Sequence, residues 1–515
     1  MTVPFQQFPS NWKVPLYWVE VDNSMAGLPV DIQPVLLVGQ KLTAGLATPD
    51  VPIPIGTLAD AGNQFGVGSM LERMFAKFFE GNAAAQMWGL PVSEPSGGVA
   101  ATGSITVTAP PTQAGTLSLY IAGQKIQIAV QGTESINVMA QNIQAAIAAV
   151  PTMPVTAVLA AAVVNLTCKW KGTSGNDIYF RDTYLSSLGG EALPVGLVLT
   201  YSTSSGGSST FAGQLKGGTG VPTFTTGINN LSDEQYEYVA MPYSDTASLL
   251  AWDAEYGFSD NGRWGWMRQQ YGMIFSARRD TYANLITYGE ANNTPVISIM
   301  EMEPDVLSPA YEVAAAYCAK AARALLDDPG RPLQTLLLTG ILGAPKHLRL
   351  DMGEINNLTQ SGLATQRISS DGVTPMILRD TTCYQKNLYG QSDDSYELLT
   401  TLATLAKVIR NQRQAITSKY PRHKLADDGT RFGIGAAIIT PTIAKAELVA
   451  EYAVDEYNGL VQNATGFKNN LIVERNSTDP NRLDVLYPPQ LINQLRIFAV
   501  LAQFRLRTPV ATVTA

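Results

Sequence analysis

The sequence predicts an α/β core, with a mixed or parallel sheet flanked by helices, an inserted β-rich α+β domain, and extended strand arms at the N- and C-termini. Apolar strand-like runs alternate with helical segments from residue 236 to 340, which is typical of a parallel sheet covered on both faces. Residues 99–215 lose Lys, Arg and Glu and contain short runs with the two-residue period of strands. Both ends of the chain carry apolar strand-like segments. The predicted divisions are an N-terminal arm at 1–24, a core at 25–95 and 223–488 that could form two subdomains, an inserted domain at 96–222 and a C-terminal arm at 489–515.

The N-terminal arm contains the stretch LYWVEVD, in which successive side chains alternate in character. This alternation has the period of a half-buried strand, and a lead-in with several prolines precedes it. The residues assigned to this strand are Leu16, Tyr17, Trp18, Val19, Glu20, Val21 and Asp22.

The C-terminal arm follows the pair Pro488-Pro489, which ends the preceding element. Through its middle the segment Leu491–Leu506 is apolar on both sides of a strand, so it needs neighbours to cover it. Polar residues at helical spacings leave an amphipathic helix as the alternative, but the Ile, Phe and Val residues favour a strand. The arm residues are Leu495, Ile497, Phe498, Val500, Leu501 and Phe504. Two such strands at opposite ends suggest that chains lend strands to one another.

The core is predicted from the spacing of its apolar residues. Gln33–Leu42 and Met87–Val92 are expected strands, and between them GVGSMLERMFAKFFEG is an expected helix capped by Ser69. Further strands are expected at 236–243, 271–278, 295–301 and 333–340, a β pair at 366–370 and 375–380, and helices at 246–256, 281–291, 309–326, 352–362, 396–418 and 441–458.

The inserted domain is marked by glycine-rich boundaries, near residues 94–98 and 206–220. Its strongest local signal is the run LSLYIAGQKIQIAV, a hairpin that turns at Ala122-Gly123, and one helix is expected at 135–150. A compact module of this kind within an otherwise continuous α/β pattern is typical of a domain inserted into a surface loop.

Composition excludes several classes of function. The net charge is −8, and the 35 Lys and Arg residues form no basic cluster, so a nucleic-acid groove is not expected. The three cysteines are far apart, which argues against a disulfide framework or a zinc site and predicts that each packs individually. No apolar run approaches the roughly 20 residues that span a bilayer, and the N-terminus lacks a signal-peptide pattern, so we expect neither secretion by a signal peptide nor membrane insertion.

No catalytic motif is found. The only histidines, His347 and His423, lie in no metal-binding or nucleophile-activating pattern, and no phosphate-binding loop is present. The carboxylates Asp253 and Glu255, and the series Glu301, Glu303 and Asp305, lack a partner base and are expected to be structural surface. We therefore predict no catalytic residue, cofactor or metal, and an α/β enzyme with an unrecognised site is the weaker alternative.

Three stretches together resemble a known family. LIVERNSTDPNRLDVLYPPQLINQLRIFAVLAQFRL, LYWVEVDNSMAG and GSMLERMFAKFFEG are similar to tail sheath proteins of contractile-tailed bacteriophages of the Mu-like type. The resemblance covers residues 1–95 and about 225–515, and the inserted module resembles the variable outer domain of such proteins.

The resemblance implies a non-enzymatic virion subunit that stacks as hexameric rings around the tail tube and contracts to drive the tube through the host envelope. Its implied partners are further copies of itself, the tail tube protein, and the baseplate and tail terminator proteins, with assembly in the host cytoplasm. It also implies that Leu16–Asp22 and Leu495–Phe504 of different neighbours add to a sheet on a third subunit. A sheath of a non-viral contractile injection machine is the alternative.

Overall fold

The computed structural model describes residues 33–203 and 207–506, and its core is built on one six-stranded sheet. The strand order is β15-β14-β13-β1-β3-β2, and every neighbouring pair is parallel except β2 with β3. The strands are β1 (Val35–Gln40), β2 (Ile53–Ile55), β3 (Met87–Val92), β13 (Tyr238–Ala240), β14 (Met273–Arg279) and β15 (Ile297–Met302). Because β1, β14 and β15 are buried along most or all of their length, helices must cover both faces of the sheet, as predicted for an α/β core.

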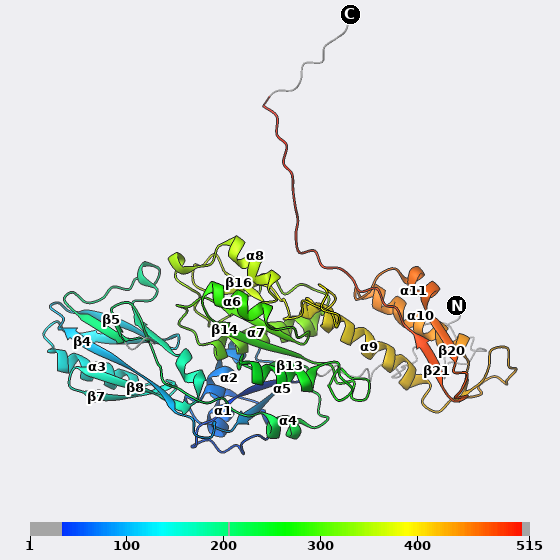
Figure 1. Ribbon diagram of the computed structural model, residues 1–515, viewed down its shortest axis with the longest axis horizontal. Coiled ribbons are helices and arrows are strands. Elements are labelled where there is room, and N and C mark those ends of the chain that lie inside the picture. Colours follow the sequence, from blue (N-terminus) through cyan, green and yellow to red (C-terminus); the bar gives the residue numbers. More distant parts are fainter. Residues whose placement is uncertain (1–32, 204–206, 507–515) are drawn as a thin grey trace, which may run out of the picture.

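Helices of the core lie in the connections between these strands and directly after β15 (Figure 1). They are α1 (Leu58–Phe65), α2 (Met70–Gly81), α4 (Thr225–Leu231), α5 (Thr246–Tyr256), α6 (Tyr282–Glu290) and α7 (Ala310–Asp327). The Ser69 side chain accepts a hydrogen bond from the Glu72 amide at 3.0 Å, so the predicted cap of α2 is confirmed. Helices α2 and α7 pack against each other and against the sheet, which buries the Met and Phe stripe of α2.

Beside the sheet, the chain continues through α8 (Met352–Gln360) and the antiparallel pair β16 (Thr365–Ile368) and β17 (Pro375–Arg379). The strand expected at 333–340 is wrong. Thr335 has a φ of +70°, a left-handed conformation that interrupts an extended run. The segment still follows β17 irregularly, because the amides of Thr335 and Leu338 each donate to a β17 carbonyl at 2.8 Å.

The chain between β3 and α4 forms an antiparallel unit, residues 99–219, with two sheets of its own. The five-stranded sheet has the order β11-β10-β4-β8-β7, and the four-stranded sheet has the order β12-β9-β5-β6. These strands are β4 (Ala100–Ala109), β5 (Gly115–Ile121), β6 (Gln124–Val130), β7 (Val155–Ala160), β8 (Val163–Lys171), β9 (Tyr179–Asp182), β10 (Val198–Ser202), β11 (Ser208–Ser209) and β12 (Gly213–Gln214), with helix α3 (Ile136–Ala148) and the 3₁₀ turns η1 (Thr173–Asp177) and η2 (Ser186–Gly189). The hairpin predicted at Ala122-Gly123 is confirmed, since both residues have positive φ, as a type I′ turn requires.

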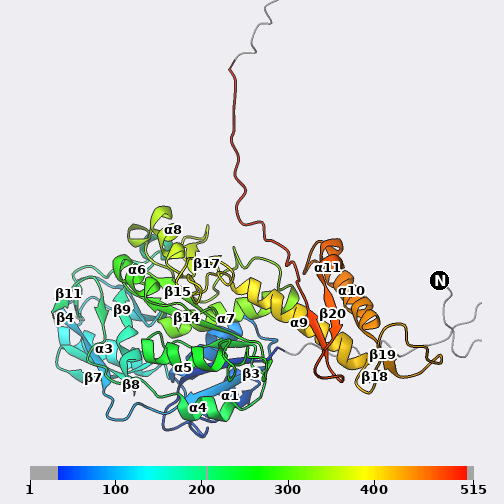
Figure 2. The same cartoon turned by 45° about the vertical axis from the view of Figure 1, so that its right-hand side comes forward.

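The long helix α9 (Leu399–Lys419) connects the core to a second body, the C-terminal unit (Figure 2). This unit contains α10 (Pro441–Tyr457), α11 (Ala464–Asn470) and two short strand pairs, namely the parallel pair β18 (Lys424–Leu425) and β19 (Ile438–Ile439) and the antiparallel hairpin β20 (Ile472–Arg475) and β21 (Leu483–Leu486). It has its own apolar cluster of Val408, Leu448, Tyr452, Leu460, Val461, Phe467 and Leu471. The antiparallel unit and the C-terminal unit lie at opposite ends of an elongated molecule (Figure 1).

Candidate assembly surface

The C-terminal arm projects from the body (Figure 1). It carries a run of large apolar side chains that are exposed. From Ile492 to Leu506 the chain forms no helix and pairs with no strand of the described residues. The helix alternative is therefore wrong for this isolated subunit. The exposed fractions are 70% for Leu495, 78% for Ile497, 82% for Phe498, 70% for Val500, 84% for Leu501 and 83% for Phe504. An apolar surface of this extent marks an interaction site. The N-terminal strand, Leu16–Asp22, lies outside the described residues.

The hairpin β20–β21 is a two-stranded sheet on the surface of the C-terminal unit. Among residues 33–203 and 207–506, neither of its outer edges pairs with a third strand. Its connecting turn is held by the Asn476 side chain, which accepts hydrogen bonds from the amides of Thr478 at 2.8 Å and Asp479 at 2.9 Å. Open edges of this kind accept an added strand through main-chain hydrogen bonds.

A cluster of aromatic rings packs at the base of this hairpin. The rings of Tyr452 and Phe467 stack with centroids 3.8 Å apart, and Tyr487 meets Phe467 edge-on at 5.0 Å. Nearby, the fully buried Asp455 accepts a hydrogen bond from Asn411 at 2.6 Å, which joins α10 to α9. Burial raises the pKa of the Asp455 carboxyl to about 6. These contacts join the base of the hairpin to α10, and α10 to α9.

At the carboxyl ends of the core strands, the antiparallel unit covers the crevice beside β1, and a cavity of about 240 Å³ is left beside β13 and β14, lined by residues that include Thr173, Asp177 and Arg279. Doubly wound sheets bind ligands where the strand order reverses, which here is at β1 between β3 and β13. At the end of β1, the side chain of Gln40 makes two hydrogen bonds to the antiparallel unit. Its Nε2 donates to the Lys171 carbonyl at 2.7 Å, and its Oε1 accepts from the Ser174 hydroxyl at 3.0 Å. Asp177 from η1 pairs with Arg279 at 2.8 Å and accepts from the Ala310 amide at 2.5 Å, so it caps α7. The antiparallel unit thus occupies part of the position in which other folds of this class hold a ligand.

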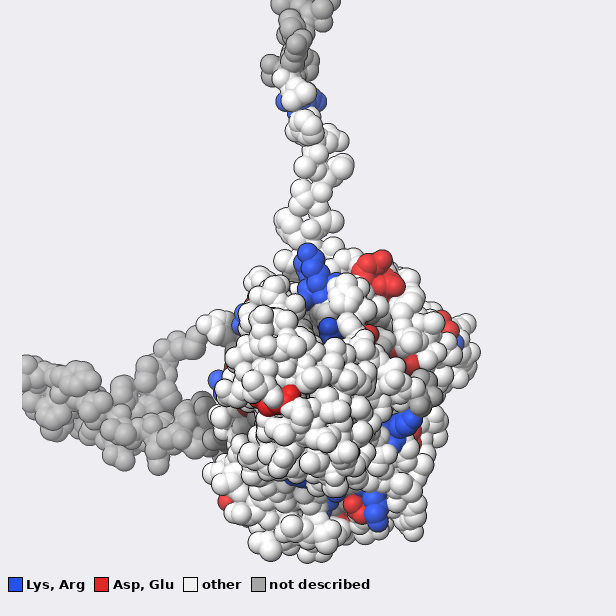
Figure 3. Space-filling view, turned by 90° about the vertical axis from the view of Figure 1, so that its left-hand side faces the viewer, with Lys and Arg blue, Asp and Glu red and all other residues white. Residues whose placement is uncertain are grey.

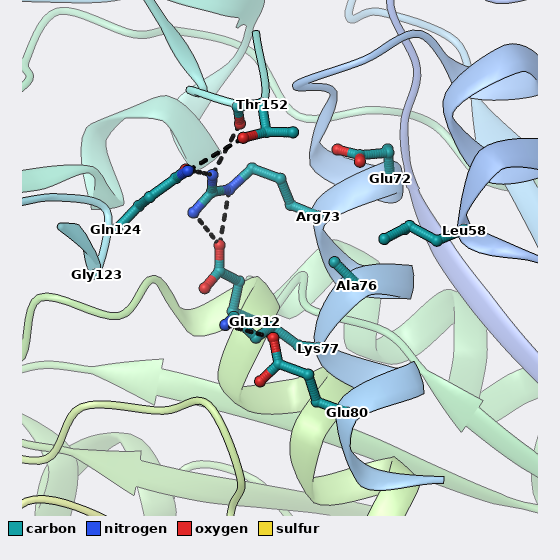
Figure 4. Close-up of a pocket in the computed structure, with 10 residues that line it drawn as sticks. All are labelled: Leu58, Glu72, Arg73, Ala76, Lys77, Glu80, Gly123, Gln124, Thr152 and Glu312. Carbon is teal, nitrogen blue, oxygen red and sulfur yellow. Dashed lines mark hydrogen bonds and ion pairs between the residues drawn. The ribbon is translucent and has the colours of Figure 1, made fainter. Parts of the chain in front are cut away.

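A cavity of about 230 Å³ lies between α2, α7 and the antiparallel unit (Figure 4). Two of its three carboxylates are paired with cations, Glu312 with Arg73 and Glu80 with Lys77. Arg73 donates from Nε to Glu312 at 2.7 Å, from Nη1 to the Gln124 side chain and the Thr152 carbonyl, both at 2.9 Å, and from Nη2 to the Ala122 carbonyl at 3.0 Å. Nη2 also lies 2.5 Å from the Glu312 carboxylate. Because the guanidinium is fully engaged, this cavity is a joint between the antiparallel unit and the core.

The carboxylates expected on the surface are partly buried instead. Glu255 pairs with Arg263 at 2.7 Å and with Arg268 at 3.0 Å, while Asp253 accepts from the Thr294 hydroxyl. Glu301 and Glu303 are only 1% and 7% exposed, so their assignment to solvated surface is wrong. They lie two residues apart in the chain, Glu301 within β15 and Glu303 just beyond its last residue. These groups hold the core together, and no histidine is bonded to any of them in the described structure.

Replacing Glu301 with glutamine is expected to make the protein more stable at alkaline pH. Burial and the neighbouring Glu303 raise the pKa of the Glu301 carboxyl above its ordinary value of 4.5. Its stabilising contribution is complete below pH 4.5 and is lost as the pH rises toward the pKa of the folded state. Between the pKa values of the unfolded and folded states, each pH unit changes the free energy of unfolding by about 1.4 kcal/mol. The variant should therefore exceed the wild type in free energy of unfolding by about 1 kcal/mol or more at pH 8 and by little at pH 4.

Thermal unfolding of Glu301→Gln between pH 4 and pH 8 measures this gain. Glu290→Gln, which removes an exposed carboxylate from the end of α6, is the control and should show no such trend. An equal melting-temperature difference at every pH would show that Glu301 ionises no differently in the folded and unfolded chains.

The remaining sequence expectations concern cysteines, metals and membranes. Cys168, Cys318 and Cys383 are all buried and unpaired, which confirms that each packs individually. The part of the chain that the structure describes contains no cluster of three or more His, Cys, Asp or Glu residues suited to a metal ion. Within the same residues, no helix has the length and apolar composition needed to cross a membrane.

Comparisons with known proteins agree with the family resemblance. The model of the phage tail sheath protein central domain matches residues 217–383, and that of the phage tail sheath C-terminal domain matches residues 391–505. The chain is 38% identical over 506 residues to the Mu-like prophage FluMu tail sheath protein of Haemophilus influenzae, an alignment that covers 98% of this chain and 100% of the relative.

Solved structures of sheath proteins also align with most of the chain. The sheath tail protein of Desulfitobacterium hafniense aligns with a TM-score of 0.46 and 11% identity, over 93% of this chain and 100% of the other. The sheath tail protein Lin1278 of Listeria innocua aligns with a TM-score of 0.45 and 12% identity, over 90% of this chain and 92% of the other. The helical sheath of the anti-feeding prophage in its contracted state aligns with a TM-score of 0.44 and 10% identity, over 96% of this chain and 100% of the other. Because the Haemophilus relative matches over nearly the whole of both chains, this protein belongs to the family of Mu-like phage tail sheath proteins, which are structural proteins of the tail.

Proposed function

We propose that this protein is the repeating subunit of a contractile sheath that stacks as hexameric rings around the tail tube and contracts to drive the tube through the host envelope during genome ejection. The observation that carries the proposal is the exposed apolar arm beside a two-stranded sheet with open edges, in a chain of the tail sheath family. The baseplate and tail terminator would bound the polymer. Assembly would take place in the host cytoplasm, and the sheath would then be part of the virion.

The contacts between subunits are proposed to be exchanged strands. The arm Leu495–Phe504 of one copy and the strand Leu16–Asp22 of another would add to the two edges of β20–β21 on a third. Main-chain hydrogen bonds would give the strength of these contacts, and the apolar side chains exposed on the arm would be covered. A contact that joins different surfaces of neighbouring copies generates rings or helical filaments rather than closed pairs, as a sheath requires.

The antiparallel unit is proposed to be the inserted outer domain, residues 96–222. Three observations support this. It lies at the end of the molecule opposite the C-terminal unit (Figure 1), both of its ends join the core side by side through the Val99–Thr219 bridge, and the family models begin only at residue 217. Few Lys, Arg, Asp or Glu side chains appear on its outward face (Figure 3). We propose that this face lies on the outside of the sheath.

Contraction is proposed to be driven by the lattice itself. An extended lattice that is metastable could relax to one that buries more surface between subunits, and a small gain per contact would be summed over every copy. The strand contacts would be kept during this change, because the chain on either side of each exchanged strand can rotate.

Negative-stain electron microscopy of two purified forms tests the proposal. The full chain is expected to form ring stacks or hollow tubes, whereas a chain that ends at Arg496 should remain monomeric, because it lacks the arm but keeps every contact of the body. A chain that lacks only residues 508–515 is the matched control and should assemble. Tubes formed equally well by the chain that ends at Arg496 would rule out strand exchange through this arm.

A further inference from the structure

The root of the C-terminal arm is a strap that crosses from the C-terminal unit to the core. At its first end, the amide of Gln462 donates to the Gln490 carbonyl at 2.9 Å and the amide of Ile492 donates to the Leu460 carbonyl at 3.1 Å. These two bonds fix the start of the strap to the C-terminal unit. Figure 1 shows the chain after β21 passing beside α11 and back toward the core before the arm projects outward.

The other end of the strap is held by the core. The Gln494 side chain donates to the Gly330 carbonyl at 3.0 Å, on the loop that follows α7. The side chain of Arg496 then points into the core and is only 10% exposed. Its Nη2 lies 2.7 Å from the carboxylate of the fully buried Asp380. Nη2 also donates to the Thr400 hydroxyl at 3.2 Å. From the next residue onward the large side chains of the arm are at least 70% exposed.

Arg496 therefore meets the body at the joint between core and C-terminal unit. Asp380 follows β17, and its other carboxylate oxygen accepts from the Thr400 amide at 3.2 Å, in the first turn of α9. Helix α9 in turn carries the C-terminal unit. One buried carboxylate thus connects the end of the core, the start of the connecting helix and the root of the arm.

This contact is incomplete. Of the three guanidinium nitrogens of Arg496 only Nη2 is engaged, while Nε and Nη1 are buried without an acceptor among the described residues. Arg73 is the contrast within the same molecule, because all of its N–H groups have acceptors. Buried donors without acceptors regain hydrogen bonds to water when they are released. The Arg496 contact is consequently much easier to open than a saturated buried ion pair.

We propose that Arg496 and Asp380 form a releasable clasp that sets the free length of the C-terminal arm. The inference rests on the proposed strand exchange. While the clasp is closed, the arm is free from residue 497 onward, and when it opens together with the adjoining Gln494–Gly330 hydrogen bond the chain is held only as far as Ile492. Four further residues then join the free arm, which adds about 13 Å to its reach at ~3.3 Å for each extended residue. A sheath whose subunits change spacing needs a reserve of this kind to keep its exchanged strands paired.

Limited trypsin digestion of the full chain tests the clasp, because Arg496 is itself a cleavage site. Exposed Arg505 on the same arm should be cut rapidly, and Arg496 more slowly by about tenfold or more, since proteolysis requires local opening. In Asp380→Asn, cleavage after Arg496 should accelerate by about tenfold while cleavage after Arg505 is unchanged. Asparagine keeps an oxygen for the Thr400 amide but removes the charge that holds Arg496.

Asp394→Asn, which removes an exposed carboxylate near the start of α9, is the matched control and should leave both rates as in the wild type. The melting temperature of each variant excludes general unfolding, and Arg496→Lys, which keeps the cleavage site and one donor group, provides an independent weakening of the clasp. Equal cleavage at both sites in the wild type, or no acceleration in either clasp variant, overturns the proposal.

Electron microscopy of the assembled variant separates the clasp from the proposed function. Asp380→Asn is expected to form sheaths, with a larger contracted fraction than the wild type. If the wild type forms no sheaths, the proposed function fails while digestion still reports on the clasp. If both proteins form sheaths with the same contracted fraction, the contact is a static anchor and the clasp is refuted.

Discussion

Replacing Arg73 with methionine is expected to lower the free energy of unfolding by about 3–5 kcal/mol, the cost of removing one partner of a buried ion pair. Glu312 is 1% exposed and would keep its charge in the interior without a cation. The Gln124 side chain and the carbonyls of Ala122 and Thr152 would lose their donor at the same time. Urea unfolding followed by tryptophan fluorescence measures the loss.

The matched control lies one turn further along α2. Lys77 pairs with Glu80 at 3.0 Å at a site that solvent reaches, so Lys77→Met should cost no more than about 1 kcal/mol. Adding Glu312→Gln to Arg73→Met should recover part of the loss, because the uncompensated carboxylate is then removed. Equal costs for Arg73→Met and Lys77→Met would show that the joint in Figure 4 does not hold the antiparallel unit to the core.

This joint also decides how the antiparallel unit can be deleted. A module in a surface loop should be dispensable for assembly, which is what the sequence suggests. The structure shows that its removal would strip Arg73 of three acceptors and Tyr311 of its edge-on contact with Trp170. A deletion of residues 99–215 therefore tests assembly only if Arg73 and Glu312 are made apolar or neutral in the same protein.

The predictable part of the fold is the part with local causes. Ser69 caps α2 because its hydroxyl reaches an amide three residues away, and the Ala122-Gly123 turn forms because both residues accept positive φ. The alternation of buried strands and amphipathic helices likewise reflects short-range periodicity. For these features the residue sequence within about ten positions contains the physical information that determines the structure.

The remainder depends on contacts between distant parts of the chain. Asp177 caps α7 although it lies 133 residues before Ala310, and no local pattern indicates that pairing. Glutamate is usually a surface residue, but Glu301 lies on β15, which is covered at this point by β16 and the residue that precedes it. The assigned strands of the two arms have the same limitation, since their partners are proposed to lie on other copies, and both assignments remain predictions.

Proline at one of two adjacent positions of the C-terminal arm is expected to abolish sheath assembly without changing the stability of the subunit. Val500 is 70% exposed, and neither it nor Leu501 is paired in the isolated chain, so Val500→Pro and Leu501→Pro should leave the melting temperature unchanged. Proline has no N–H to donate and a fixed φ, so it removes a ladder hydrogen bond from an added strand. A loss of about 1 kcal/mol per contact would recur at every subunit of the polymer.

The two variants together report how the arm is seated. Successive N–H groups of a strand point to opposite sides, so an arm on an outer edge should tolerate proline at one of the two positions, whereas an arm between two strands should tolerate it at neither. Val500→Thr keeps a β-branched side chain and the N–H, and it should assemble normally. Sheath yield by sedimentation and electron microscopy distinguishes these cases. Normal sheaths from both proline variants would mean that the arm binds through its side chains alone, because a strand cannot lose the N–H on either side and still pair along its length.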